Sequence, residues 1–310
     1  DAAATDAALA AAPRVVRIAL RNNRLVPSPL EPRAVLAAYE EAAGAWRITV
    51  GAQGMPAMRK ELATIREKTT KPYNVNFFCH RQPEHDGQRE AAWRAALAPY
   101  YAEFGIDADA IPASPGRLPF SVEASEVLEE FRPAVVSFHF GLPDARLLAR
   151  VRKLGAKILS SATTVEEAIW LEANGVDAVI AQGIEAGGHR GMFLTADIGT
   201  QVGTFALVPQ VARAVKIPVI AAGGIADARG VAAAMALGAA GVQVGTAYLL
   251  CPEVTTSTIH RSVLKSEAAR HTALTNLFTG RPSRGIVNRV MRELGPISSA
   301  TPEFPLAVAA

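Results

Sequence analysis

The sequence has 310 residues, of which 50% are hydrophobic and 20% charged, and its 32 basic and 29 acidic side chains give a formal net charge of +3. This length and composition suit one large core, and the basic residues are scattered without a long run, so nucleic-acid binding is not indicated. No stretch approaches the ~18–20 uninterrupted apolar residues of a membrane span. The alanine-rich, acidic N-terminus lacks the charged start of a signal peptide. We therefore expect a cytoplasmic protein with neither nucleic-acid nor membrane partners.

The cysteine content points away from disulfides and metal centres. Only Cys79 and Cys251 occur, which is too few for a disulfide framework. The adjacent pair Cys79 and His80 does not have the ligand spacing of a zinc site. We expect both thiols to be packing residues and predict no metal site.

The first quarter of the chain contains weak element signals interrupted by prolines. Val26–Pro32 holds three prolines, which break regular structure. The expected elements are a strand at Val15–Leu20, a helix at Arg33–Ala43, a strand at Trp46–Val50, a helix at Pro56–Lys68 and a strand at Tyr73–Phe78. The last strand places Asn76 near its carboxyl end.

Residues 80–116 separate this strand from the next and contain no strand pattern. They hold many prolines and charges, with a helical stretch at Gln88–Phe104. An excursion of this length is uncommon unless it is functional, so we predict an insertion that covers the mouth of the fold. His80 and His85 lie within it and are expected at the surface.

A regular alternation of helix and strand patterns follows, with a period of about 20–30 residues. The expected helices are Ser121–Phe131, Pro143–Leu154, Thr164–Asn174, Thr204–Ala214 and Ala228–Leu237. The expected strands are Val135–Phe140, Ala156–Ser160, Ala178–Ala181, Ile217–Ala222 and Gly241–Val244. The pattern predicts an α/β fold: one (β/α)8 TIM barrel over residues 1–310, with a helical insertion after its third strand.

The loop Ala181–Gly191 is the most distinctive stretch of the sequence. It follows the apolar strand Ala178–Ala181 and combines four glycines with polar side chains: Gly183, Gly187, Gly188 and Gly191 with Gln182, Glu185, His189 and Arg190. Glycines permit a close backbone approach to a ligand, and the polar groups can bind or titrate. The loop is typical of a ligand site, although a glycine-rich connection with an incidental histidine is the alternative.

Two glycine junctions follow at the ends of the next two expected strands. Gly223-Gly224 ends one strand and Gly245-Thr246 ends the other, and each precedes a helix or helical turn. The loops after strands seven and eight bind phosphate in many (β/α)8 barrels, because helix-start N–H groups need acceptors. We predict a phosphate site here, with a simple tight turn as the alternative.

These motifs together resemble those of the nitronate monooxygenases, formerly called 2-nitropropane dioxygenases. The resemblance is carried by Asn74–His80, Gln182–Gly191, Ala221–Asp227 and Gln243–Thr246, and it covers roughly Ala52–Leu294. One departure is that Arg24–Pro32 stands where the family has a Pro-Met-Gly-type loop against its flavin.

The resemblance implies an FMN-dependent enzyme, either a monomer or a homodimer, in which His189 is catalytic. The residues implied to contact FMN are Asn76, Gln182, Gly187, Gly188, Gly223, Gly224, Gln243, Val244, Gly245 and Thr246. His139 either lines the substrate pocket or has a packing or capping role. The implied reaction takes an alkyl nitronate, such as propionate 3-nitronate, and O2 to a carbonyl compound and nitrite. An imidazole of ordinary pKa near ~6.5 could take the proton of a nitroalkane or, once protonated, pair with the nitronate.

Two other functions fit the central motif. A flavin-dependent enoyl-ACP reductase shares the barrel, the histidine loop and the phosphate glycines, and would use NADH. A barrel that holds FMN or another phosphate ligand without turnover is the non-enzymatic alternative. The Asn74–His80 run and the insertion after it favour the nitronate reaction.

Overall fold

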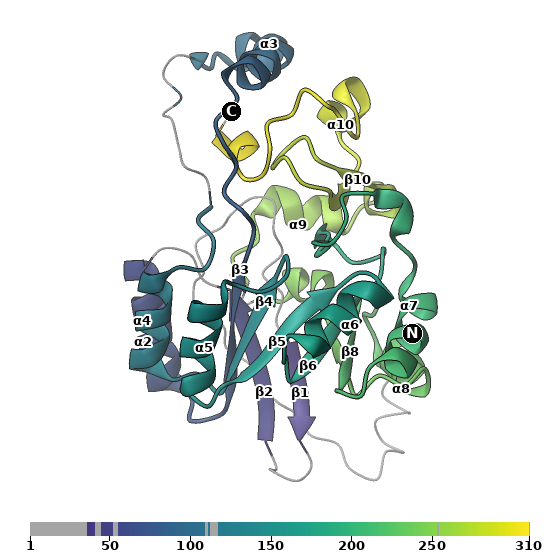
Figure 1. Cartoon of the computed structure of the whole chain (residues 1–310). Helices are drawn as coiled ribbons and strands as arrows, with labels where there is room; N and C mark the ends of the chain where they lie inside the picture. Colours follow the sequence, from purple (N-terminus) through teal and green to yellow (C-terminus); the bar gives the residue numbers. More distant parts are fainter. Residues whose placement is uncertain are drawn as a thin grey trace.

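The computed structural model describes residues 36–40, 45–51, 55–108, 111, 117–252 and 254–309. Its main feature is a curled sheet of eight strands in the order β1-β2-β3-β4-β5-β6-β8-β9, a fold of the TIM-barrel type (Figure 1). The strands are β1 (Leu36–Glu40), β2 (Ala45–Gly51), β3 (Tyr73–Phe78), β4 (Val135–His139), β5 (Lys157–Ala162), β6 (Ala178–Gln182), β8 (Val219–Ala222) and β9 (Gly241–Gln243). The expected strand Val15–Leu20 and the stretch Arg24–Pro32 lie outside the described residues.

From β2 to β9 every strand pairs in parallel with its neighbour, as the alternation in the sequence predicted. β1 is the exception, since it pairs antiparallel with β2, with Leu36 opposite Thr49. The prediction of a helix at Arg33–Ala43 is therefore wrong over Leu36–Glu40. Pairing with β2 overrides the helical pattern of this alanine-rich segment, because tertiary context outweighs weak local propensity.

Helices cover the outer face of the sheet (Figure 1). They are α2 (Met55–Lys68), α4 (Val122–Phe131), α5 (Ala145–Lys153), α6 (Val165–Ala173), α7 (Thr204–Ala214) and α8 (Ala228–Ala236), close to the expected ranges. Side-chain caps define several of their starts: Ser121 accepts from the amide of Ala124, and Thr164 from that of Glu167. Cys79 packs against the core between sheet and helices, as expected for a packing residue.

The inner face of the sheet changes from apolar to polar along the strands. Its apolar cluster is Val135, Leu159, Ala178, Ile180 and Ala222. Because side chains alternate between faces, the same strands present Ser137, His139, Ser161 and Gln182 further along the inner face. The carboxyl ends of the strands therefore form a polar mouth above an apolar base, which is where active sites of this fold lie.

A second layer of structure lies beyond these carboxyl ends. It contains the short strand β7 (Gly188–His189), which pairs with β11 (Ser283–Ile286), which in turn pairs with β10 (Thr272–Thr275). The helices α9 (Thr258–Leu264) and α10 (Arg289–Leu294) and four 3-10 turns complete it: η2 (Ile198–Thr200), η3 (Thr246–Leu250), η4 (Glu267–Arg270) and η5 (Leu306–Ala309). The sequence patterns did not predict β7, β10 or β11.

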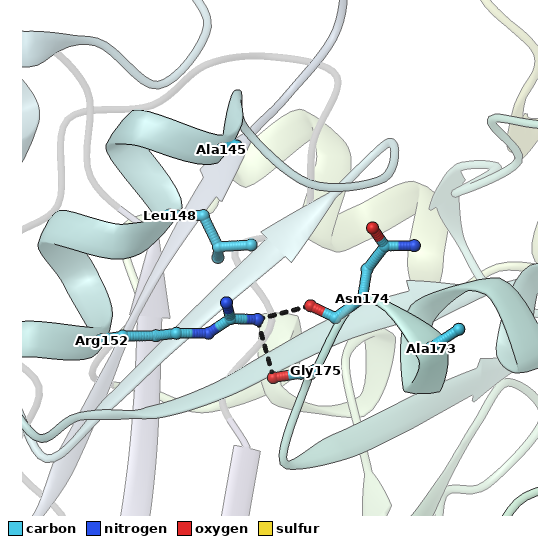
Figure 2. Close-up of a pocket in the computed structure, with 6 residues that line it drawn as sticks. All are labelled: Ala145, Leu148, Arg152, Ala173, Asn174 and Gly175. Carbon is cyan, nitrogen blue, oxygen red and sulfur yellow. Dashed lines mark hydrogen bonds between the residues drawn. The ribbon is translucent and has the colours of Figure 1, made fainter.

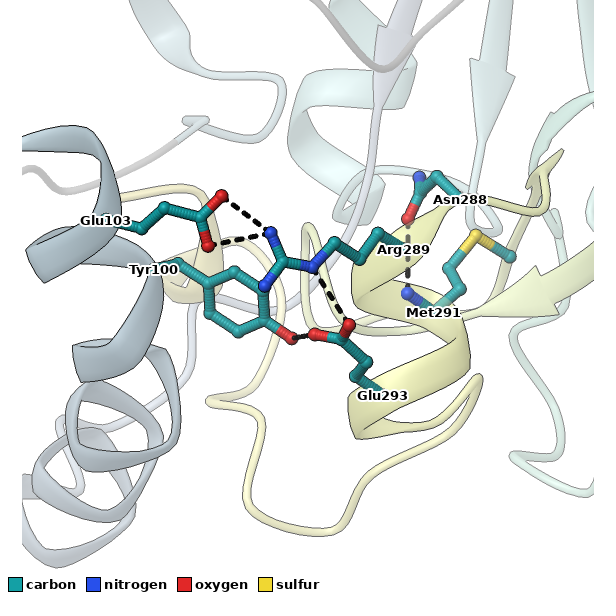
Figure 3. Close-up of polar contacts among 6 residues, drawn as sticks. All are labelled: Tyr100, Glu103, Asn288, Arg289, Met291 and Glu293. Atoms are coloured by element: carbon teal, nitrogen blue, oxygen red, sulfur yellow. Dashed lines mark hydrogen bonds and ion pairs between the residues drawn. The ribbon is translucent and has the colours of Figure 1, made fainter.

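The long helix of the insertion, α3 (Gly87–Phe104), docks onto this second layer. Its Trp93 packs with Leu277 and Met291 in a small separate core. A polar network joins α3 to α10: Arg289 Nη1 on α10 donates to both carboxylate oxygens of Glu103 on α3 at 2.7 Å (Figure 3). In the same network the Tyr100 hydroxyl donates to Glu293 at 2.6 Å. None of the described helices is both long and apolar enough to cross a bilayer.

Candidate functional site

The loop after β6 is folded back onto the end of its own strand by two buried side chains. The side-chain amide of Gln182 donates to the carbonyl of His189 at 3.0 Å and accepts from the amide of Gly191 at 2.8 Å. Arg190 is fully buried, and its guanidinium donates to the carbonyls of Gln182 and Gly183 at 2.7 Å each. These bonds satisfy loop backbone groups that water cannot reach, so they hold His189 in one place.

The buried carboxylate of Glu167 holds the far end of the histidine loop through hydrogen bonds. Glu167 accepts from the hydroxyl and amide of Thr163 at 2.7 and 2.6 Å and from the amide of Phe193 at 2.6 Å. Gln201 links Thr163 to Arg190, since its side chain donates to the Thr163 hydroxyl at 2.9 Å and accepts from Arg190 Nε at 3.0 Å. Both ends of the loop are therefore anchored to helix α6 and to the chain beyond it.

His189 lies at the end of this braced loop, in an aromatic enclosure. Its side chain is buried, and Nε2 is hydrogen bonded to the hydroxyl of Thr279 at 2.8 Å. The rings of Phe304, Phe140 and Phe78 surround it, with centroids 5.1, 5.9 and 6.1 Å away. The enclosure removes water from the imidazole and fixes its plane.

Two further histidines belong to the same cluster. His139, at the end of β4, is hydrogen bonded through Nδ1 to Ser161 at 2.9 Å and through Nε2 to the carbonyl of His189 at 3.3 Å. His80 is buried against Phe304 and hydrogen bonded to the carbonyl of Arg117 at 2.9 Å. The expectation that His80 is a surface residue is therefore wrong, because Phe304 from the distant end of the described chain covers it. His85 is exposed as expected.

All three histidines of the cluster are neutral at physiological pH. Burial, with the positive charges of Arg117 and Arg281, lowers the pKa of His189 to about 3. Burial also lowers the pKa of His139 to about 3 and that of His80 to about 4. The ordinary pKa assumed from the sequence for His189 does not apply in this enclosure, because a charged imidazole there would lose its hydration and face two guanidinium groups.

The two arginines stack on the phenylalanines of the enclosure. The guanidinium of Arg117 lies 4.7 Å from the centre of the Phe78 ring, and that of Arg281 lies 4.0 Å from the centre of Phe140. Burial lowers the pKa of each arginine to about 10, so both remain charged at neutral pH. The positive charge of the site is therefore carried by these arginines and not by a histidine.

The glycine junctions lie together on the other side of the mouth, at the ends of β8 and β9. Gly223 and Gly224 have positive φ of 113° and 69°, which favours glycine. A Cβ atom added at Gly187 would lie 2.7 Å from Thr246 Oγ1, so the histidine loop passes directly against the second junction. The turn η3 starts at Thr246 after Gly245 without a side-chain cap. Its first backbone N–H groups can therefore donate hydrogen bonds to an anion.

Glu185 has a structural partner within this region. Its carboxylate accepts from the amide and the hydroxyl of Thr204 at 2.8 Å each and so caps the start of α7. These bonds hold the histidine loop beside Gly223 and Gly224. The two segments are close: a Cβ atom added at Gly224 would lie 3.4 Å from the Glu185 side chain. A negative end on helix α7 is favourable for the helix dipole.

The structure gathers the site residues expected from the sequence at one end of the sheet. They are Asn76 on β3, His139 on β4, Gln182 on β6, Gly187, Gly188 and His189 in the loop and β7, Gly223 and Gly224 after β8, and Gln243, Val244, Gly245 and Thr246 on and after β9. Asn76 accepts a hydrogen bond from the hydroxyl of Ser137 at 2.8 Å, which fixes its amide at the mouth.

Sequence reasoning did not identify Arg117, Thr279, Arg281 or Phe304, which complete the enclosure of His189. The only hint in the sequence is the glycine between Thr279 and Arg281. In the structure Gly280 has a positive φ of 88° and contacts the backbone of Pro302 and Glu303, so glycine is required there. The turn Thr279–Arg281 brings its two polar side chains to His189 only because it packs on that distant segment.

A separate surface groove of about 480 Å³ lies between α5 and the end of α6 (Figure 2). Arg152 crosses it and donates to the carbonyls of Asn174 and Gly175 at 2.5 and 3.2 Å. Its lining residues differ from those of the histidine cluster, and the arginine serves to satisfy the end of helix α6.

The family model of nitronate monooxygenase matches residues 33–309. Nitronate monooxygenases of Paraburkholderia phytofirmans and Pseudomonas aeruginosa are each 42% identical over 88% of this chain and over 75% and 78% of their own lengths.

Solved structures agree with this relationship. Nitroalkane oxidase from Streptomyces ansochromogenes superposes with a TM-score of 0.75 and 38% identity, covering 84% of this chain and 74% of its own. FabK from Thermotoga maritima superposes with a TM-score of 0.58 and 31% identity, covering 82% and 67%. The geometry, the family match and these relatives lead to one conclusion: this chain belongs to the nitronate monooxygenase family.

Proposed function

We propose that this protein oxidises alkyl nitronates, such as propionate 3-nitronate, with O2 to a carbonyl compound and nitrite, with FMN as its cofactor. The observation that carries the proposal is the position of His189, which faces an aromatic and cationic enclosure at the same mouth as the two glycine junctions. Membership of the nitronate monooxygenase family supports the same reaction.

FMN fits the glycine side of the mouth. Gly187 packs against Thr246 and Gly224 against Glu185, so the histidine loop and the two glycine junctions meet at one place. The uncapped start of η3 supplies N–H donors, so Gly223, Gly224, Gly245 and Thr246 would hold the phosphate. Asn76, Gln182, Gly187, Gly188, Gln243 and Val244 would lie along the rest of the cofactor. Bound FMN supplies the redox chemistry, which no side chain of this site can supply.

His189 is the residue that handles the proton. Its neutral imidazole can accept a proton from the carbon next to a nitro group. The Thr279 hydroxyl donates to the carbonyl of Arg281 at 3.3 Å, so its oxygen is left to accept from His189 Nε2. The imidazole then carries its lone pair on Nδ1, which is the accepting atom. The low pKa makes His189 a weak base for a neutral nitroalkane, whereas a preformed nitronate needs no proton removed. This asymmetry favours nitronates as substrates.

We also propose that the insertion 80–116 covers the mouth. Support comes from two of its described parts: His80 packs inside the enclosure, and α3 is tied to α10 through Arg289 and Tyr100. A cover of this kind would keep bulk water from the reacting groups.

Oxygen consumption tests the reaction directly. The FMN-loaded protein should consume O2 and form nitrite on addition of propionate 3-nitronate alone. Consumption that starts only after NADH is added would support a reductase instead, and a flavin reduced by neither compound would support a binding protein.

A further inference from the structure

Arg281 occupies an unusual position for a charged side chain. Its guanidinium is stacked on Phe140, and one of its terminal nitrogens donates to the carbonyl of Met192, just beyond the histidine loop. Its Nε atom is buried and makes no hydrogen bond to the described part of the chain. A buried donor left in this way is costly unless a ligand or water serves it, so its retention needs an explanation.

Among the described residues, no carboxylate forms an ion pair with Arg281. The carboxylate whose field acts on Arg281 belongs to Glu167, and its oxygens already accept hydrogen bonds from Thr163, Phe193 and Leu194. The positive charge of Arg281 is therefore available to a bound anion inside the enclosure.

A second guanidinium acts on the same space. Arg117 stacks on Phe78, and the rings of Phe78 and Phe140 lie 4.7 Å apart, so the two cations sit on adjoining faces of one aromatic pair. Both phenylalanine rings lie about equally far from His189, at 6.1 and 5.9 Å. Both charges act on the imidazole between these rings, because each contributes to lowering the pKa of His189.

We propose that Arg281, assisted by Arg117, binds the two oxygens of the nitronate group and holds the reacting carbon against His189. This inference rests on the proposed function, because it assigns a binding site for that substrate. A nitronate is planar and carries its negative charge on two oxygens, which is the geometry that a guanidinium fork matches with paired N–H donors. Lysine, as a point charge, would match it less well.

In this arrangement, anion binding and proton transfer are carried out by different side chains. The arginines supply charge for the substrate anion, and His189 stays neutral and handles the proton. A neutral nitroalkane gains less from the guanidinium groups, so the arginines select for the anionic form of the substrate.

The test compares Arg281→Gln, Arg281→Lys and Arg117→Gln with wild type, with Arg270→Gln as a matched loss of charge at an exposed position. For propyl 1-nitronate we expect KM to rise by ~10- to 100-fold in Arg281→Gln and less in Arg281→Lys, with a smaller change in kcat. The KM of neutral 1-nitropropane should change by less than about threefold. Arg270→Gln should match wild type. Equal losses for the two substrates, or an unchanged KM for the nitronate, would overturn the proposal.

Ligand binding gives a readout that does not depend on turnover. Crotonate, a planar carboxylate of similar shape, should bind wild type by titration calorimetry, and its neutral amide should not. Arg281→Gln should abolish crotonate binding while flavin content and thermal midpoint stay within error of Arg281→Lys. Crotonate binding that persists in Arg281→Gln would exclude the arginine site. Arginine-dependent crotonate binding by a protein that oxidises no nitronate would keep the anion site and reject only the proposed function.

Discussion

His189 Nε2 is hydrogen bonded to Thr279 Oγ1 at 2.8 Å, although the two residues are 90 positions apart in the sequence. The bond joins the histidine loop after β6 to the turn between β10 and β11, and it fixes both the tautomer and the plane of the imidazole. Replacing Thr279 with valine keeps the shape of the side chain but removes the partner of a buried ring nitrogen.

We expect Thr279→Val to lower the free energy of unfolding by about 1–3 kcal/mol, the cost of an unsatisfied buried polar group. Turnover of 1-nitropropane should also fall, because the lone pair of the imidazole is no longer directed. Thr279→Ser is the control, since it retains the hydroxyl. Chemical denaturation and steady-state rates should be measured on wild type and both variants. A valine variant as stable and active as the serine variant would contradict the role of the Thr279 hydroxyl as the partner of His189.

Substitution of His189 itself separates proton transfer from packing. His189→Asn should lower turnover of neutral 1-nitropropane by ~10²-fold, the low end of general acid–base help, because a pKa of about 3 makes the imidazole a weak base. The preformed nitronate should lose less, since its proton is already gone. Rates for both substrates from pH 5 to 9, with the flavin spectrum as a check of cofactor binding, test this. Small and equal losses for the two substrates would remove His189 from the chemistry.

Acid should destabilise the fold through its buried histidines. The pKa values of His80, His139 and His189 are lowered to about 4, 3 and 3, whereas an unfolded histidine titrates near ~6.5. Between these values the unfolded chain binds protons that the folded chain does not, so stability is full above about pH 6.5 and falls as the pH drops.

Each histidine adds at most ~1.4 kcal/mol per pH unit to this slope. Thermal midpoints from pH 8 to 4 should show the decline, and His139→Gln should have a shallower one. His85→Asn, at an exposed position, is the control and should follow wild type. A midpoint that stays constant down to pH 5 would show that these histidines are hydrated in solution.

Flavin binding should depend on the glycine at the first junction. Gly224→Val places a branched side chain where φ is 69° and against Glu185, beside the proposed phosphate, so the junction should shift and flavin occupancy should drop severely. Gly155→Val is a matched control with a similar φ of 76° and open space around the added atom. Both variants bear similar backbone strain, of about 1–2 kcal/mol. Flavin-to-protein absorbance ratios that are equal in the two variants would place the phosphate elsewhere.

The docking of α3 can be tested through its polar network with α10. Arg289→Gln removes the donors to Glu103 and Glu293, and hydrogen exchange in α3 should become faster. Arg292→Gln on the same helix is the control, because it removes an equal charge at an exposed position. Faster exchange with unchanged nitronate turnover would show that α3 is dispensable as a cover.

Local sequence patterns predicted most of the barrel but not the enclosure around His189. Each strand from Val135 to Gln243 is a short apolar run followed by a polar or glycine residue, so its position is encoded within a few residues. The helix expected at Arg33–Ala43 was wrong because an alanine-rich segment is decided by its pairing partner. His80 was misplaced, and Arg281 was missed, since both depend on contacts with Phe304 or Phe140, which no local period records.

The two guanidinium groups beside His189 connect anion uptake to proton uptake. Their positive field, together with burial, lowers the pKa of the imidazole, and a bound anion would cancel much of that field. Linkage then requires that a proton on His189 strengthen anion binding by the same factor by which the anion strengthens proton binding. A substrate that enters as an anion would thus raise the basicity of the group that acts on it, and calorimetry in buffers of different ionisation enthalpy would count the protons taken up.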